Sequence, residues 1–108
     1  MTMIFNKEGD LIINETLTIR ELVLKHKANL AGAELVGVNL SGLDLSGANF
    51  EGASLSEANF KNANLTNANL KNADLKYSNL TDAVFTGANL EGANLYRIEA
   101  YFFKLLTK

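Results

Sequence analysis

Few side chains in this chain of 108 residues are of the types that carry out chemistry on a substrate. There is one histidine, His26, and no cysteine, so a thiolate nucleophile and a thiolate metal site are both excluded. No motif places a second metal-binding residue near His26. The acidic residues of the central region are scattered rather than paired: Glu34, Asp44, Glu51, Glu57, Asp74, Asp82 and Glu91. We therefore predict no catalytic residues, no cofactor and no metal, and we do not expect an enzyme.

The charge and hydropathy of the chain also restrict its partners. Ten basic and twelve acidic residues give a net charge of −2, which is too small to indicate a nucleic acid or an anionic membrane surface. The first residues lack the long apolar core of a signal peptide, and no run approaches the roughly eighteen apolar residues of a membrane span. We expect one domain, located in the cytoplasm, with no direct contact to nucleic acid or membrane.

The elements that position these side chains follow from a strict repeat of five residues. Leucine or phenylalanine stands at every fifth position from Leu30 to Leu95, and a small residue, mostly alanine, precedes it by two positions except at Val38 and Leu43. In an α-helix this period rotates the apolar residue by about 140° per repeat, and in a flat strand it alternates between the two faces. All the large residues stay inside only if the chain turns a corner in each repeat.

Glycine and asparagine support such corners, because they recur two residues after the large apolar residue. A turn residue with positive φ is tolerated best when it is glycine or asparagine. We predict positive φ at these positions: Gly32, Gly37, Gly42, Gly47, Gly52, Asn62, Asn67, Asn72, Gly87 and Gly92.

The repeat unit itself, as in Ala63-Asn64-Leu65-Thr66-Asn67 and Ala88-Asn89-Leu90-Glu91-Gly92, resembles the pentapeptide-repeat family. The resemblance implies an all-β solenoid, a right-handed quadrilateral β-helix of about 3.5 coils with twenty residues per coil. Residues twenty apart then stack, which places Asn29, Asn49, Asn69 and Asn89 in one unbroken column. We expect these amides to be structural, bonding either to one another or to the backbone of the turns.

The two ends of the chain depart from the repeat. At the start, residues 3–6 and 11–14 flank a polar glycine turn and predict a β-hairpin. Thr18 and Glu21 form a capping-box signature that predicts a helix over residues 19–27. The expected organisation is a hairpin and capping helix (1–27), the β-helix (28–97) and a C-terminal cap or dimerisation segment (98–108).

The C-terminal segment is rich in large apolar residues and could be a short helix or a degenerate coil. These residues either cover the last coil or form a patch for self-association: Tyr101, Phe102, Phe103, Leu105 and Leu106. The family resemblance implies dimers that form through the C-terminal end, so a homodimer is expected.

One side of the predicted coil gathers residue types that are common in binding hot spots. Lys76, Tyr77, Tyr96 and Arg97 combine two exposed aromatic rings with basic neighbours. The alternative is that Tyr77 and Tyr96 stack one coil apart and only shield the coil.

The function predicted from these features is a non-catalytic protein-binding or scaffold module whose partner is not identified. Two alternatives stay open. The family resemblance implies that the chain could act as a DNA mimic that modulates a type II topoisomerase such as gyrase, although a mimic of about 17 Å would need on the order of ten negative charges. The other alternative is a purely structural solenoid.

Overall fold

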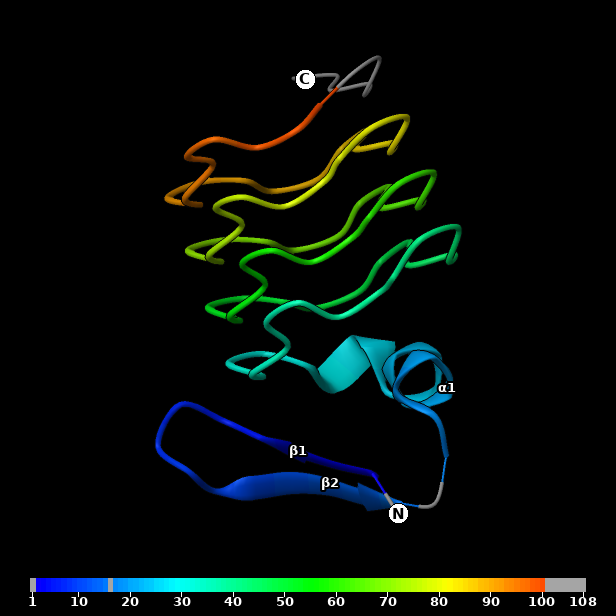
Figure 1. Ribbon diagram of the computed structural model, residues 1–108, viewed down its shortest axis with the longest axis vertical. Helices are drawn as coiled ribbons and strands as arrows, with labels where there is room; N and C mark the ends of the chain where they lie inside the picture. Colours follow the sequence, from blue (N-terminus) through cyan, green and yellow to red (C-terminus); the bar gives the residue numbers. More distant parts are fainter. Residues whose placement is uncertain (1, 16, 101–108) are drawn as a thin grey trace.

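The computed structural model describes residues 2–15 and 17–100. Figure 1 shows successive coils stacked along the longest axis, with a hairpin and a helix at the N-terminal end of the stack. The C-terminal residues predicted for self-association, Tyr101 to Leu106, lie outside the described residues.

The N-terminal hairpin consists of β1 (Thr2–Phe5) and β2 (Leu11–Glu15), which pair in antiparallel fashion with Ile4 opposite Ile13. The side chain of Asn6 closes the turn between them with two hydrogen bonds. Its Oδ1 accepts from the backbone N–H groups of Glu8 and Asp10 at 3.1 and 2.9 Å. Ile4 is buried, and the backbone N–H of Glu34 donates to the Phe5 carbonyl at 3.0 Å. The hairpin is therefore attached to the first coil through β1.

Helix α1 (Ile19–Lys25) begins at the predicted capping box. The backbone N–H of Glu21 donates to Thr18 Oγ1, and the Glu21 carboxylate accepts from the Thr18 backbone N–H at 2.9 Å. The helix ends two residues earlier than predicted, and the chain continues through a 3-10 turn, η1 (Lys27–Asn29). The reason is that the first coil already uses this backbone, because the Asn49 N–H donates to the Lys27 carbonyl at 2.7 Å.

Each corner of the coil is a tight turn closed by the small residue of the next repeat. For example, the Ala48 N–H donates to the Leu45 carbonyl at 3.0 Å, and Gly47 between them has φ of 71°. Positive φ at the third residue of a turn is the signature of type II, which favours glycine or asparagine there. Positive φ is confirmed at all the glycine and asparagine positions predicted for it.

Three of the four asparagines of the predicted column bond to the backbone of their own turns, whereas Asn29 lies in η1 and does not make this bond. Oδ1 of Asn49 accepts from the Glu51 N–H at 3.1 Å, and Asn69 and Asn89 make the same bond at 3.0 Å to Lys71 and Glu91. Of the two modes predicted, the bond to the turn backbone is the one observed. The same bond recurs at Asn39, Asp44, Asn59, Asn64, Asp74, Asn79 and Asn94.

Neighbouring coils are joined by parallel bridges between residues twenty apart, such as Glu34 to Ser54 and Ser54 to Asp74. Leu55 N–H donates to the Asp74 carbonyl at 2.8 Å, and Ser54 N–H donates to the Ala33 carbonyl at 2.8 Å. Over the described part of the repeat region these contacts are isolated bridges and not extended strands, because a corner every five residues interrupts any longer ladder.

The predicted inward residues fill the core. Each leucine or phenylalanine of the repeat from Leu30 to Phe85 is at most 1% exposed, and the rings of Phe50 and Phe60 meet edge to face with centroids 6.4 Å apart. Toward the C-terminal end Leu90 and Leu95 are only partly buried. Since burial of such side chains contributes roughly 1.5–3 kcal/mol each, the repeat accounts for the stability of the coil.

Candidate binding surface

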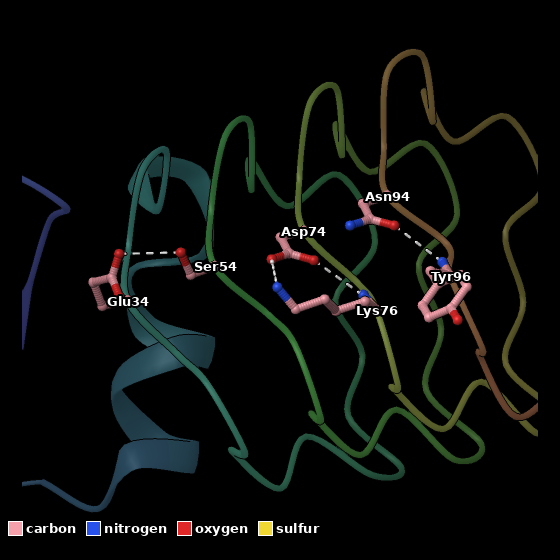
Figure 2. Close-up of polar contacts among 6 residues, drawn as sticks. All are labelled: Glu34, Ser54, Asp74, Lys76, Asn94 and Tyr96. Atoms are coloured by element: carbon pink, nitrogen blue, oxygen red, sulfur yellow. Dashed lines mark hydrogen bonds and ion pairs between the residues drawn. The ribbon is translucent and has the colours of Figure 1, made fainter.

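The four predicted binding residues lie on one corner of the solenoid. We define the tyrosine edge as the stacked turns 36–37, 56–57, 76–77 and 96–97. Glu34, Ser54, Asp74 and Asn94 each lie two positions before the first residue of one of these turns (Figure 2). Parallel bridges between these four residues hold the turns in register. The structure thus brings Lys76, Tyr77, Tyr96 and Arg97 together on two adjacent coils.

Tyr77 and Tyr96 contact each other across the two coils. Their ring centroids are 5.8 Å apart with an interplanar angle of 78°, an edge-to-face pair, and the two residues are 49% and 57% exposed. Such a pair stabilises the structure by about 0.5–1.5 kcal/mol beyond its buried area. The contact predicted between the tyrosines is therefore present, while about half of each side chain stays accessible to a partner.

Arg97 is held against Tyr96. Its Nε donates to the Tyr96 hydroxyl at 3.2 Å, and its guanidinium carbon lies 5.6 Å from the centroid of the Tyr96 ring. Both contacts reduce the freedom of an exposed side chain. The contacts with Tyr96 therefore restrict the conformation of the exposed, charged Arg97 side chain.

Lys76 is different, because a neighbour compensates its charge. Its Nζ lies 3.2 Å from Oδ2 of Asp74, while Oδ1 of Asp74 accepts from the Lys76 backbone N–H at 3.1 Å (Figure 2). The Asp74 carboxylate thus both closes the turn and pairs with the ammonium group. The basic character predicted for this side is carried mainly by Arg97.

The backbone of the tyrosine edge differs from that of the other corners. Stacked turns form one column at each of the four corners of the coil, and the second residue of each two-residue corner has positive φ. In three of these columns that residue is glycine, asparagine or, once, Asp82. On the tyrosine edge Gly37 is followed one coil at a time by Glu57, Tyr77 and Arg97, with φ of 61°, 61° and 52°. Residues with long or aromatic side chains rarely adopt this conformation, which costs them roughly 1–2 kcal/mol each.

The twenty-residue coil also places Glu57 on this side, one coil before Tyr77, but residue type alone does not select Glu57 as a binding residue. The signal was present, since Glu57 occupies the position at which the repeat otherwise has glycine or asparagine. The same signal marks Tyr77 and Arg97, which were selected for their residue types alone. Departures from the turn consensus are therefore a second, independent indicator of the surface.

Among the described residues, the side chains that could hold a metal ion are not gathered into a site. Within residues 2–15 and 17–100 no group of three or more His, Cys, Asp or Glu residues is placed to hold a metal ion. His26 is half-buried at the end of α1, where its backbone N–H donates to the Leu22 carbonyl. In the same described ranges no helix has the length and apolar content needed to span a bilayer.

Two carboxyl groups away from the tyrosine edge have perturbed acidity. The Thr18 backbone N–H, followed by the Thr18 side chain, lowers the pKa of Glu21. The Ser46 hydroxyl, followed by the Ser46 backbone N–H, lowers the pKa of Asp44. Both groups close turns or caps, so their perturbation has a structural cause.

Comparison with known proteins identifies the family. The family model for pentapeptide repeats matches residues 26–62 and 63–98 with eight copies. The chain therefore belongs to the pentapeptide-repeat family, and its fold is a solenoid of the right-handed β-helix type. Among curated proteins none matches the chain.

Several solved structures are similar to this chain. A pentapeptide repeat protein from the thylakoid lumen of Arabidopsis thaliana is 33% identical with a TM-score of 0.64, over 65% of this chain and 48% of that one. The chain thus spans about half the length of that relative. Rfr23, a pentapeptide repeat protein from the cyanobacterium Cyanothece 51142, is 37% identical with a TM-score of 0.45. The match covers 68% of this chain and 60% of the Rfr23 chain. HetL of Nostoc sp. strain PCC 7120, a protein involved in heterocyst differentiation regulation, is 34% identical with a TM-score of 0.39. The match covers 67% of this chain and 38% of the HetL chain.

Proposed function

We propose that this protein is a non-catalytic protein-binding module and that the tyrosine edge is its binding surface. The observation that carries the proposal is the run of Glu57, Tyr77 and Arg97 in left-handed conformation on one corner. Their side chains are exposed, so burial does not compensate the strain. Strained residues that the fold does not need are concentrated at functional sites.

The side chains of the same corner support the proposal. Tyrosine and arginine are enriched at binding hot spots because they bury a large area and also offer polar groups. Here Tyr96 contacts both Tyr77 and Arg97, so little side-chain entropy is lost when a partner binds. A cytoplasmic location and a homodimer through the C-terminal end stay predictions from the sequence and the family.

The experiment is a quantitative affinity purification from the cells that produce the protein. Three baits are compared: the wild type, the double variant Tyr77→Ser/Tyr96→Ser, and the control Lys71→Ser/Glu91→Ser on another side of the coil. We expect specific partners to be depleted about tenfold or more with the tyrosine variant and to be unchanged with the control. Equal recovery with all three baits contradicts the proposal.

A melting curve of each bait accompanies the purification. Loss of the Tyr77–Tyr96 contact lowers the free energy of unfolding by about 1 kcal/mol, which leaves the protein folded. A loss of binding that is accompanied by unfolding is therefore recognised as such, and the single variant Tyr77→Phe then replaces the double variant.

A further inference from the structure

The charged side chains on and beside the tyrosine edge differ in whether a neighbouring side chain pairs with them. Lys76 is paired with Asp74, and the Glu34 carboxylate accepts a hydrogen bond from Ser54 Oγ at 3.0 Å (Figure 2). Arg97 donates through Nε to the neutral Tyr96 hydroxyl, and none of the described carboxylates forms an ion pair with it. The C-terminal end of the edge therefore presents an oriented guanidinium group without a counter-charge among the described residues.

We infer that the tyrosine edge recognises a carboxylate in an extended segment of a partner protein through Arg97, beside an apolar side chain that packs on Tyr77 and Tyr96. The inference rests on the proposed function and adds the chemistry of the partner. With Nε engaged by Tyr96, the two terminal nitrogens of Arg97 are the donors that can form a fork toward a carboxylate. The two aromatic rings next to them supply the apolar contact.

The second turn of the tyrosine edge carries the opposite charge. Glu57 is exposed and lies two coils before Arg97 in the same column of turns. Coils joined by β-bridges are about 4.8 Å apart, so these two positions are separated by about 10 Å, the length of roughly three residues of extended chain. The complementary segment therefore runs along the solenoid axis and carries a carboxylate and, about three residues away, a basic side chain.

Charge also favours a protein partner over a nucleic acid. A nucleic acid is held by neutralising many phosphates with a basic surface. Among the described residues the tyrosine edge offers one cation without a counter-charge, near the carboxylates of Glu34, Glu57 and Asp74, and the whole chain has a net charge of −2. A single carboxylate that meets Arg97 fits this distribution.

The probe for the test is a displayed library of random linear peptides, selected on the immobilised wild-type protein. Enriched peptides are synthesised, and their dissociation constants are measured for the wild type, Arg97→Gln, Arg97→Lys and Tyr77→Ser/Tyr96→Ser. We expect the enriched peptides to share an acidic residue beside an apolar one. Their affinity falls about tenfold or more with Arg97→Gln, and by less with Arg97→Lys, which keeps the charge but not the fork.

The possible outcomes separate this inference from the proposed function. Enriched peptides that lack an acidic residue, or that bind Arg97→Gln as well as the wild type, overturn the inference. If these peptides still lose affinity with Tyr77→Ser/Tyr96→Ser, the proposed function stands without it. Peptides that are indifferent to the tyrosine variant contradict both. A selection without enrichment also overturns the inference, and the affinity purification then decides the proposed function independently.

Discussion

The side-chain amide of Asn67 occupies the space that a β-carbon on Gly87 would take, one coil further along the solenoid. Gly47, in the same column of turns, has open space at the corresponding point. The two glycines have φ of 71° and 72°, so the backbone strain of an alanine is equal at both positions. They form a matched pair in which only the stacking contact differs.

Gly87→Ala is expected to be more destabilising than Gly47→Ala. Both variants bear the cost of a left-handed alanine, about 1 kcal/mol, and Gly87→Ala must in addition displace the Asn67 amide. Urea denaturation measures both, together with the double variant Asn67→Gly/Gly87→Ala. In the background of Asn67→Gly, the cost of Gly87→Ala falls to that of Gly47→Ala. Equal costs in the wild-type background contradict the stacking contact.

Ser78→Ala is expected to stabilise the protein by about 1 kcal/mol. Ser78 occupies the small inward position of its repeat, is 0% exposed, and its Oγ has no hydrogen-bond partner in the described structure. A buried hydroxyl without a partner costs about 1–3 kcal/mol, whereas alanine fits the same space. The control is Ala58→Ser one coil before, which should lower the free energy of unfolding. A decrease in the free energy of unfolding with Ser78→Ala, or an increase with Ala58→Ser, would contradict our view of the core.

Glu57→Asn is expected to raise the free energy of unfolding by about 0.5–1 kcal/mol. Asparagine tolerates the left-handed conformation that strains glutamate at this position. Asp82→Asn is the control, because aspartate and asparagine both visit this region and φ at Asp82 is similar at 59°. Thermal melts compare the two. If Asp82→Asn gains as much as Glu57→Asn, the stabilisation does not come from relief of strain.

The left-handed residues also show how far the sequence predicts this protein. The period of five predicts the buried column from Leu30 to Phe85 and the positive φ at the glycine and asparagine corners, because both follow from the geometry of a turning chain. The end of α1 at Lys25 could not be predicted, since it depends on a hydrogen bond from Asn49, a residue of the next coil.

For the candidate surface, the residue types alone selected Lys76, Tyr77, Tyr96 and Arg97. The pattern did not show that Asp74 compensates Lys76, because that ion pair depends on the side-chain conformation at a corner. The twenty-residue coil places Glu57 on the same side, but its residue type did not select it for binding, and its left-handed backbone is visible only in the structure. The C-terminal segment after Ala100 stays a prediction.

The acid stability of the protein is expected to depend on Glu21 and Asp44. Both have a folded pKa below the ordinary values of 4.5 and 3.8, so their contribution to stability is present above those values and is lost as the pH falls through the lower folded pKa. The double variant Glu21→Gln/Asp44→Asn keeps acceptors for the same N–H groups but cannot titrate. Its melting temperature should therefore fall less steeply below about pH 4.5 than that of the wild type. Parallel curves would show that these two groups do not contribute.

The most direct test of the central claim is photo-crosslinking from the tyrosine edge itself. A benzophenone side chain is placed at Tyr77 in one variant and at Lys71, on another side of the coil, in a second, and both are irradiated in the cells that produce the protein. We expect discrete crosslinked proteins from position 77 that are absent from position 71 and that decrease when Arg97→Gln is added. Identical crosslinks from both positions, or none from position 77, would contradict a binding role for the tyrosine edge.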